Sequence, residues 1–302
     1  MKKITKILKK KFKNFNPKLK EECGVFGISD NQDASTLSTL GLHALQHRGQ
    51  EGCGVVTFDG KKYHSEKRFG LVGDNFNKEE VLKSLPGSFA IAHNRYSTTG
   101  GTTLRNIQPF YADTNTGGIG VAHNGNLTNA ITLRRKLVED GAIFYTTSDT
   151  ETIVQLIARS KRGKVIDKII DALFQIQGGY ALVMLAKDLL IGVRDPFGIR
   201  PLVIGKLKDS YVFASETCAL DIIGAKYMRD VENGDVIRNE HSPFLIPKNA
   251  IFENASQFLT LAYDIHWQSI CHRSWKRILY AYDFNGFRKS ISNEFRRNIP
   301  SN

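Results

Sequence analysis

Cys23 opens the stretch of this sequence with the most evident chemistry. It is followed by Gly24 and a short apolar run typical of a β-strand, and it comes directly after Glu21 and Glu22 at the end of a lysine-rich segment. If the chain is cleaved before Cys23, its freed α-amine lies beside its thiol, so one residue supplies both nucleophile and base. The alternative is a buried strand cysteine, since free cysteine is among the most buried residue types.

Asn124 and Gly125 form a second candidate pair, directly after the strand-like run Ile119–His123. Asn-Gly is first of all a turn signal. The functional interpretation is an oxyanion hole, in which the Asn124 side-chain amide and the Gly125 backbone N–H point at one position. Glycine suits that role because it lets the backbone approach a ligand closely.

Asp149 lies in Ser148–Glu151, which has the pattern of a capping box at the start of a helix. An acidic residue in the first turn complements the helix dipole and needs no further function. The same field keeps the carboxylate ionised, so Asp149 is also suited to hold a substrate ammonium if it faces a cleft. The helix that follows has an apolar stripe of Ile153, Val154, Leu156 and Ile157.

Two arginines stand at the ends of predicted elements. Arg95 lies at the root of the small-residue loop 93–101, after a strand at Phe89–Ala92. Such a loop is suited to be a mobile active-site lid, and it is equally consistent with an irregular surface loop. Arg48 belongs to the polar cluster Gln46–Glu51, which ends a helix predicted over Ala34–Gln46, and an ordinary C-cap with solvated charges explains that cluster as well.

The elements that must position these residues alternate in blocks. Short strands come first, helices predicted at about 129–139, 148–157 and 165–175 come next, and further strands follow at 180–185, 189–193, 202–204, 211–214 and 235–237. Asp195–Gly198 is a tight turn, and 219–223 is a short helix. Strands, then helices, then strands predict an α+β layered domain rather than a parallel βαβ repeat. The chain contains no GxGxxG sequence and no P-loop, so no nucleotide cradle is visible.

Composition sets broader limits. The 302 residues are 41% hydrophobic and 24% charged, as in ordinary globular proteins. Four widely spaced cysteines argue against a disulfide framework or a zinc site and suit a reducing cytoplasm. No apolar run reaches the length of a membrane span. The net charge of +12 lies mainly in the two ends, where residues 1–22 hold nine lysines and two glutamates, so we expect no nucleic-acid surface on the folded body.

The leader at residues 1–22 has no continuous apolar core and is not a secretory signal. We expect it to be a disordered, removable pro-segment. A basic amphipathic segment resting on an anionic membrane surface is the alternative.

Several motifs in one order resemble the glutaminase domain of the amidophosphoribosyltransferases, the glutamine phosphoribosylpyrophosphate amidotransferases of purine synthesis. The similarity covers about Glu21 to Ile237. Other amidotransferases, such as glucosamine-6-phosphate synthase and asparagine synthetase, share fewer of these motifs. The stretches that carry the resemblance are Cys23–Gly27, Gln46–Glu51, Gly70–Phe76, His93–Gly100, His123–Leu127, Ser148–Glu151 and Arg194–Leu202.

This resemblance implies an α+β fold of the N-terminal-nucleophile hydrolase type, a four-layer αββα sandwich with two antiparallel sheets between helix layers. It also implies that Cys23, freed by loss of residues 1–22, attacks the glutamine side-chain amide. Asn124 and Gly125 are then expected to stabilise the tetrahedral oxyanion. Ammonia leaves, and water hydrolyses the thioester to glutamate.

The remaining roles implied by the resemblance concern substrate binding. Arg95 is expected to pair with the glutamine α-carboxylate, and Asp149 with its α-ammonium. Thr98 lies in the loop expected to close over the site and is a further substrate contact. Arg48 and His93 are expected to support the site.

The resemblance also divides the chain into a removable pro-segment at 1–22, a class II glutamine amidotransferase domain at 23–240 and a divergent tail at 241–302. Family members continue into a phosphoribosyltransferase domain, and nothing like its acidic phosphoribosyl-binding motif occurs here. A reading-frame change or a degraded gene would produce such a tail. We therefore expect no cofactor in this chain, because the magnesium and iron–sulfur cluster of some family members would belong to the missing domain.

Three classes of function follow from the sequence. The first is a glutaminase that supplies ammonia, with glutamine as substrate, phosphoribosyl pyrophosphate bound by a separate or missing domain, and a homo-oligomer as its assembly. The second is an inactive fragment with an exposed former interface. The third is a module that binds nucleic acid or membrane through its basic ends. Of these, we expect the first, without nucleic-acid or membrane partners and in the cytoplasm.

Overall fold

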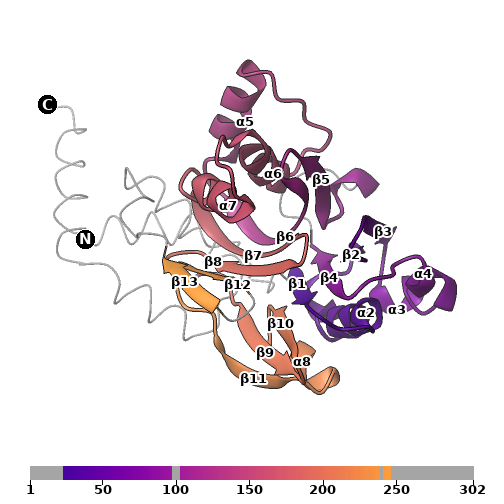
Figure 1. Ribbon diagram of the computed structural model, residues 1–302. Helices are drawn as coiled ribbons and strands as arrows, with labels where there is room; N and C mark the ends of the chain where they lie inside the picture. The colour runs from indigo at the N-terminus through magenta and orange to yellow at the C-terminus, as the bar shows by residue number, and fades with distance from the viewer. Residues whose placement is uncertain (1–22, 97–102, 239–240, 246–302) are drawn as a thin grey trace, which may run out of the picture.

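Two antiparallel sheets lie face to face in the middle of the computed structural model, which describes residues 23–96, 103–238 and the backbone of 241–245 (Figure 1). The first sheet has seven strands, in the order β11 (Lys226–Asp230), β9 (Val203–Leu207), β10 (Ser210–Ala214), β1 (Gly24–Ile28), β4 (Phe89–Arg95), β2 (Gly52–Phe58) and β3 (Tyr63–Phe69). The second has six, in the order β13 (His241–Leu245), β12 (Asp235–Arg238), β8 (Leu189–Arg194), β7 (Gly178–Ala186), β6 (Gly117–Leu127) and β5 (Phe110–Thr114).

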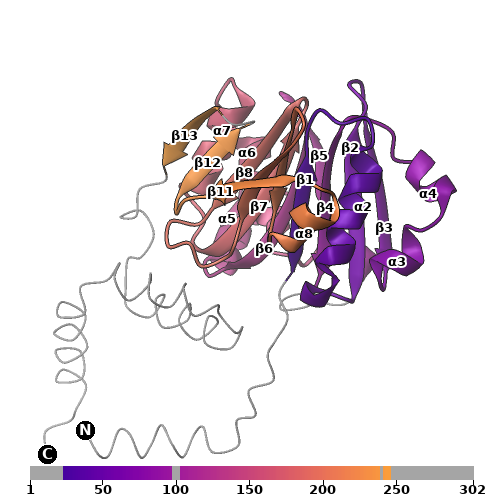
Figure 2. The same ribbon diagram turned by 90° about the horizontal axis from the view of Figure 1, so that it is seen from below.

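Helices cover the outer face of each sheet, which makes four layers. The first sheet is covered by α2 (Ala34–Ala44) and α8 (Cys218–Ile222), which Figure 2 shows in front of its strands. The second is covered by α6 (Thr150–Arg159) and α7 (Val165–Leu173), with α5 (Ala130–Glu139) beside them. Short helical turns complete the described residues: η1 (Gln46–Arg48), α3 (Val72–Asn75), α4 (Glu79–Lys83) and η2 (Leu104–Asn106).

The space between the sheets is filled by apolar side chains from both, among them Val25, Ile91, Val183 and Phe213. Gly27 of β1 allows the close approach of the sheets, since a Cβ there would meet the Val183 side chain at 2.5 Å. Burial of this apolar surface on both faces of each sheet is the main force that holds the layers together. The predicted four-layer αββα arrangement is confirmed.

Two strands of the site are longer than predicted. His93, Asn94 and Arg95 belong to β4 rather than to a loop, because β4 pairs with β1 as far as Asn94 and with β2 as far as Arg95. The turn interpretation of Asn124 and Gly125 is wrong. They continue β6 and pair with Ala181 and Tyr180 of β7.

The capping box predicted at Ser148–Glu151 is also wrong. Helix α6 begins at Thr150, and Asp149 at its N-cap makes no side-chain capping bond. The Glu151 carboxylate instead accepts the backbone N–H groups of Tyr145 and Thr146, each at 2.7 Å. The apolar stripe of the helix is confirmed, because all four of its predicted residues are buried.

The sequence patterns missed several elements, namely β5, β11, β13, α3 and α4. The strands β5 and β11 stand at sheet edges, where exposed side chains interrupt the apolar alternation. No helix of the described part of the chain is both long and apolar enough to cross a membrane. The cytoplasmic location stays a prediction.

Candidate active site

Cys23 stands at the N-terminal end of β1, next to the last residues of β4. Its Sγ lies 3.4 Å from both the carbonyl oxygen and the amide nitrogen of Tyr96, so the thiol donates to one and accepts from the other. Two residues further on, the Val25 N–H donates to Ser215 Oγ at 3.0 Å. The β1 strand is thus fixed on both sides, by β4 and by the segment after β10.

Burial raises the pKa of the Cys23 thiol above its ordinary value. The Tyr96 hydrogen bond and the positive charges of Arg95, Arg200 and Arg48 act in the opposite direction. Burial has the larger effect, so the thiol is protonated at neutral pH and needs a base that removes its proton before it can act as a nucleophile.

Arg48 supports the backbone of Cys23. Its Nε donates to the Cys23 carbonyl oxygen at 3.1 Å, and its terminal nitrogen pairs with Glu216. His47 Nε2 lies 3.2 Å from the same carboxylate. Burial alone would raise the pKa of Glu216, but Arg48 and His47 lower it overall. Glu216 was not predicted from the sequence, because nothing local marks its contact with Arg48, 168 residues away.

Asn124 and Gly125 lie together near the end of β6. The Asn124 side chain is buried, and its Nδ2 has no hydrogen-bond partner in the described structure. Because a buried donor without an acceptor is destabilising, natural proteins keep few of them. Gly125 has φ +139°, and a Cβ there would lie 2.1 Å from the Gly179 carbonyl oxygen. Position 125 therefore requires glycine, and it lies next to the Asn124 amide donor, which has no acceptor in the described structure.

Arg95 ends β4 with its guanidinium buried. It donates from a terminal nitrogen to the carbonyl oxygen of Asn106 at 2.7 Å, and its Nε lies 3.7 Å from a Glu51 carboxylate oxygen. Asn106, in turn, exchanges two hydrogen bonds with Thr147, at 2.8 and 3.1 Å. The Arg95 side chain is thereby tied to the segment that leads into Asp149.

Asp149 faces β6 from the start of α6. Its Oδ2 accepts the Leu127 N–H at 2.9 Å, and its Oδ1 lies 3.8 Å from Nδ1 of His123. His123 Nδ1 is also 3.0 Å from Thr150 Oγ1. Burial lowers the pKa of His123 although Asp149 raises it, so the imidazole is neutral at pH 7.

His93 points from β4 into the space between the sheets. Its Nε2 lies 3.1 Å from the carbonyl oxygen of His123, to which it donates as the Nε2–H tautomer. Burial lowers the pKa of His93 to about 3. Because its ring is neutral at physiological pH and one nitrogen is used in this contact, His93 joins the two sheets rather than serving as a base. The supporting role expected for His93 stays a prediction.

Arg200, in the stretch Arg194–Leu202, is a further residue of the site that was not predicted from the sequence. Its backbone N–H donates to Asp195 Oδ2 at 3.2 Å, and the Asp195 carboxylate also accepts the N–H groups of Phe197 and Ile199, each at 2.9 Å. This turn places the buried Arg200 so that its charge acts on both Cys23 and His123. The sequence indicates only a turn here, not that the buried Asp195 carboxylate accepts three backbone N–H groups of that turn.

A continuous series of contacts joins most of the predicted site residues. From Cys23 it passes through Tyr96 to the neighbouring Arg95, then through Asn106 and Thr147 to the segment of Asp149. His123 connects Asp149 to the neighbouring Asn124, and His93 connects His123 to β4. Thr98 and the rest of the expected lid lie outside the described residues. Within those residues, no group of three or more His, Cys, Asp or Glu side chains is arranged to hold a metal ion.

Comparisons with known proteins identify the family. A family model described as a glutamine amidotransferase domain matches residues 93–221. The amidophosphoribosyltransferase of Rhizobium etli is 56% identical over 225 residues, which are 74% of this chain and 45% of that protein. The chloroplastic amidophosphoribosyltransferase of Vigna aconitifolia is 49% identical over 250 residues, 80% of this chain and 51% of that protein.

Solved structures agree. One described as the allosteric regulatory enzyme of purine biosynthesis is 45% identical, with a TM-score of 0.69 over 72% of this chain and 46% of that one. The glutamine phosphoribosylpyrophosphate amidotransferase of B. subtilis, complexed with ADP and GMP, is 44% identical, with a TM-score of 0.68 over 72% of this chain and 47% of that one. The chain spans about half the length of the curated relatives it matches. It carries a glutamine amidotransferase domain of the amidophosphoribosyltransferase family.

Proposed function

We propose that this domain hydrolyses the side-chain amide of glutamine to glutamate and ammonia, with Cys23 as the nucleophile. The observation that carries the proposal is the buried Asn124 Nδ2, which has no acceptor in the described structure and stands beside a position that only glycine can occupy. A donor of this kind is suited to an oxyanion that exists only during the reaction. It lies in a domain whose relatives are amidotransferases.

The chemistry begins with cleavage of the peptide bond before Cys23. The freed α-amine accepts the thiol proton, and Sγ attacks the side-chain carbonyl carbon of glutamine. The carbonyl oxygen becomes an oxyanion, which the Asn124 amide and the Gly125 N–H stabilise by about 2.7–4 kcal/mol for each donor. The tetrahedral intermediate collapses with loss of ammonia, which takes the proton from the amine. Water then hydrolyses the thioester and restores the thiol.

The raised pKa of the Cys23 thiol, which keeps it protonated at neutral pH, supports the need for that amine. His93 and His123 are the histidines within the series of site contacts, and burial lowers the pKa of both. Neither is suited to take a proton near pH 7. The α-amine of an N-terminal residue, with an ordinary pKa of about 8, is suited to do so.

Two charged groups are proposed to hold the two ends of the amino acid. The planar fork of Arg95, fixed through Asn106, would pair with the α-carboxylate. Asp149, held by the Leu127 N–H, would take the α-ammonium. Thr98 is proposed as a further substrate contact. Arg48 acts through Cys23, whose carbonyl oxygen it binds. The hydrolysis uses these side chains and water, and we propose that it needs no cofactor in this chain.

We further propose that the ammonia is used by a phosphoribosyltransferase domain, which would add it to phosphoribosyl pyrophosphate during purine synthesis. The support is that the relatives are amidophosphoribosyltransferases and that this chain covers about half of their length. The proposal includes that domain and a homo-oligomer that would couple the two activities.

The test is to express the full chain, measure its intact mass, and assay the release of ammonia and glutamate from glutamine. We expect a mass that lacks residues 1–22 and a turnover that Cys23→Ala abolishes. The control is Cys53→Ala, which removes a buried thiol whose pKa burial raises to about 12. An intact mass that retains residues 1–22, together with turnover that survives Cys23→Ala, would overturn the assignment of the nucleophile.

A further inference from the structure

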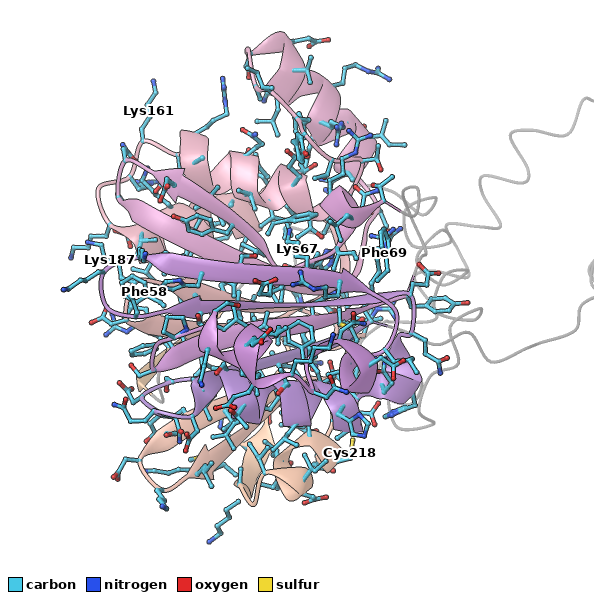
Figure 3. The ribbon with its side chains drawn as sticks, turned by 90° about the vertical axis from the view of Figure 1, so that its right-hand side faces the viewer. Phe58, Lys67, Phe69, Lys161, Lys187 and Cys218 are labelled. Carbon is cyan, nitrogen blue, oxygen red and sulfur yellow. The ribbon has the colours of Figure 1, made fainter. Side chains whose placement is uncertain are left out.

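A separate cavity of about 470 Å³ opens where the edges of the two sheets meet. It lies between β3, the last strand of the first sheet, and β5, the last strand of the second, and is closed by η2 and the start of α6. None of the residues proposed to act on glutamine lines it. Figure 3 shows this side of the molecule, with Lys67 of β3 near the centre of the view.

Lys67 places a positive charge in this cavity. Its Nζ lies 4.9 Å from the centre of the Phe110 ring, and the side chain is largely covered. Burial lowers the pKa of Lys67 to about 8, so the ammonium is still the main form at pH 7. No carboxylate of the described residues lies within ion-pair distance of it. A covered charge normally has a partner. The face of the Phe110 ring supplies only part of the stabilisation that water would give the ammonium.

A second cation lines the same cavity. Arg105 of η2 is exposed, and its guanidinium lies 5.9 Å from the centre of the Tyr145 ring. Glu151 is the acidic residue among the described residues that line the cavity. It accepts the N–H groups of Tyr145 and Thr146 and the Thr146 hydroxyl, at 2.7–2.8 Å, so both of its oxygens face the protein. The cavity therefore presents a net positive charge to a ligand.

Three of the other lining residues, two of them tyrosines, are exposed. The exposed fractions are 72% for Tyr145, 37% for Tyr111 and 47% for Leu104. Large apolar side chains gathered at one opening indicate a binding surface more strongly than scattered ones do. Tyrosine rings stack well on other flat rings. Lys67 and Arg105 are suited to phosphate or carboxylate oxygens.

We propose that this cavity binds a small molecule that carries an oxyanion on a flat aromatic ring. The oxyanion lies between Lys67 and Arg105, and the ring packs against Tyr145 and Tyr111. Gln155 of α6 also lines the cavity. Its Nε2 donates to the Ile143 carbonyl oxygen at 2.8 Å, so its Oε1 is the atom suited to accept from a polar group on the ring.

The wall of the cavity is shared with the proposed glutamine site. Arg105 is followed by Asn106, whose carbonyl oxygen holds Arg95. Tyr145 and Thr146 precede Thr147, which hydrogen-bonds the Asn106 side chain. A ligand that moves either segment would change the KM for glutamine. This effect on KM rests on the proposed function, whereas binding of a ligand in the cavity does not. The experiment below measures that binding alone.

The test uses pyridoxal 5′-phosphate, a flat ring with a phosphate and an aldehyde, on the full chain. The unprotonated Lys67 amine adds to the aldehyde carbon and water leaves, which gives an imine. Borohydride then adds a hydride and fixes the product as a secondary amine, located by peptide mass. At pH 7.5 we expect Lys67 to be modified at least about tenfold faster than the exposed Lys161, because more of its amine is unprotonated.

Competition distinguishes a binding site from a merely reactive amine. Phenyl phosphate should protect Lys67 at lower concentration than inorganic phosphate or phenol, and Arg105→Gln should weaken this protection at least about fivefold. Since Arg105 is exposed, this variant is expected to fold. Labelling of Lys67 no faster than Lys161, or fast labelling without protection by phenyl phosphate, would overturn the proposal. Equal protection by inorganic phosphate would overturn the part of it that concerns the ring.

Discussion

The sharpest prediction compares two buried asparagines that stand on different sheets. Asn124 Nδ2 has no partner in the described structure, whereas Asn94 Nδ2 donates to the Leu42 carbonyl oxygen at 2.7 Å. If Asn124 serves the transition state, Asn124→Ala removes an oxyanion donor and nothing that the resting fold uses. If Asn94 serves the fold, Asn94→Ala removes a structural hydrogen bond and leaves the chemistry alone.

Asn124→Ala is expected to lower kcat, whereas Asn94→Ala is expected to lower stability. Loss of one oxyanion donor raises the activation free energy by about 2.7–4 kcal/mol, so kcat for glutamine hydrolysis should fall about 10²–10³-fold in Asn124→Ala. Its free energy of unfolding should change by less than about 1 kcal/mol, because removal of an unpaired buried donor offsets some lost packing. Asn94→Ala should lose roughly 1 kcal/mol of stability or more, with kcat of the folded protein within about tenfold of the parent.

The assay is steady-state glutamate formation, with the urea unfolding curve of each variant measured in parallel. The KM for glutamine should change little in Asn124→Ala, since the donor is used only after attack. The reasoning is refuted if Asn124→Ala retains kcat within tenfold of the parent. It is also refuted if Asn124→Ala loses more stability than Asn94→Ala, because Asn124 would then be a structural residue.

Three further predictions concern neighbouring residues. His93 has a folded pKa of about 3 against an ordinary value of about 6.5, so the unfolded chain binds an extra proton between these values. The free energy of unfolding should therefore fall by up to about 1.4 kcal/mol per pH unit as the pH drops through this window. His93→Gln should reduce that slope in unfolding curves measured from about pH 7 to 4. Gly125→Ala should destabilise the domain by at least about 1–3 kcal/mol in urea, because the backbone has φ +139° and the new Cβ would meet the Gly179 carbonyl oxygen. Arg48→Ala should lower kcat about 10–150-fold, equivalent to about 1.5–3 kcal/mol for a charged hydrogen bond, without a matching rise in KM, because Arg48 binds Cys23 rather than substrate.

Each of these has a result that would contradict it. An unchanged pH slope in His93→Gln would mean that other groups govern acid unfolding. Normal stability of Gly125→Ala would show that β6 and β7 tolerate a wider separation there. A rise in KM with unchanged kcat in Arg48→Ala would place that side chain against the substrate.

Local sequence patterns determined much of the fold. The apolar stripe of α6 and the strand that follows Cys23 were predicted because the side-chain periods of helices and strands are written in consecutive residues. Cys23, Arg95 and Asp149 were proposed from the sequence as residues that border predicted elements, and their roles stay predictions. Edge elements such as β5 and β11 were missed, because their exposed faces carry no apolar period.

Tertiary structure decided what those residues contact. The Asn-Gly pair has the local preference of a turn, yet pairing with β7 keeps it in strand β6 and leaves its amide donor buried. Arg48 meets Glu216 across 168 residues, and Lys67 meets Phe110 only because the two sheets stack. Spacing along a chain encodes local conformation, whereas burial, charge pairing and register depend on which distant segments the folded layers bring together.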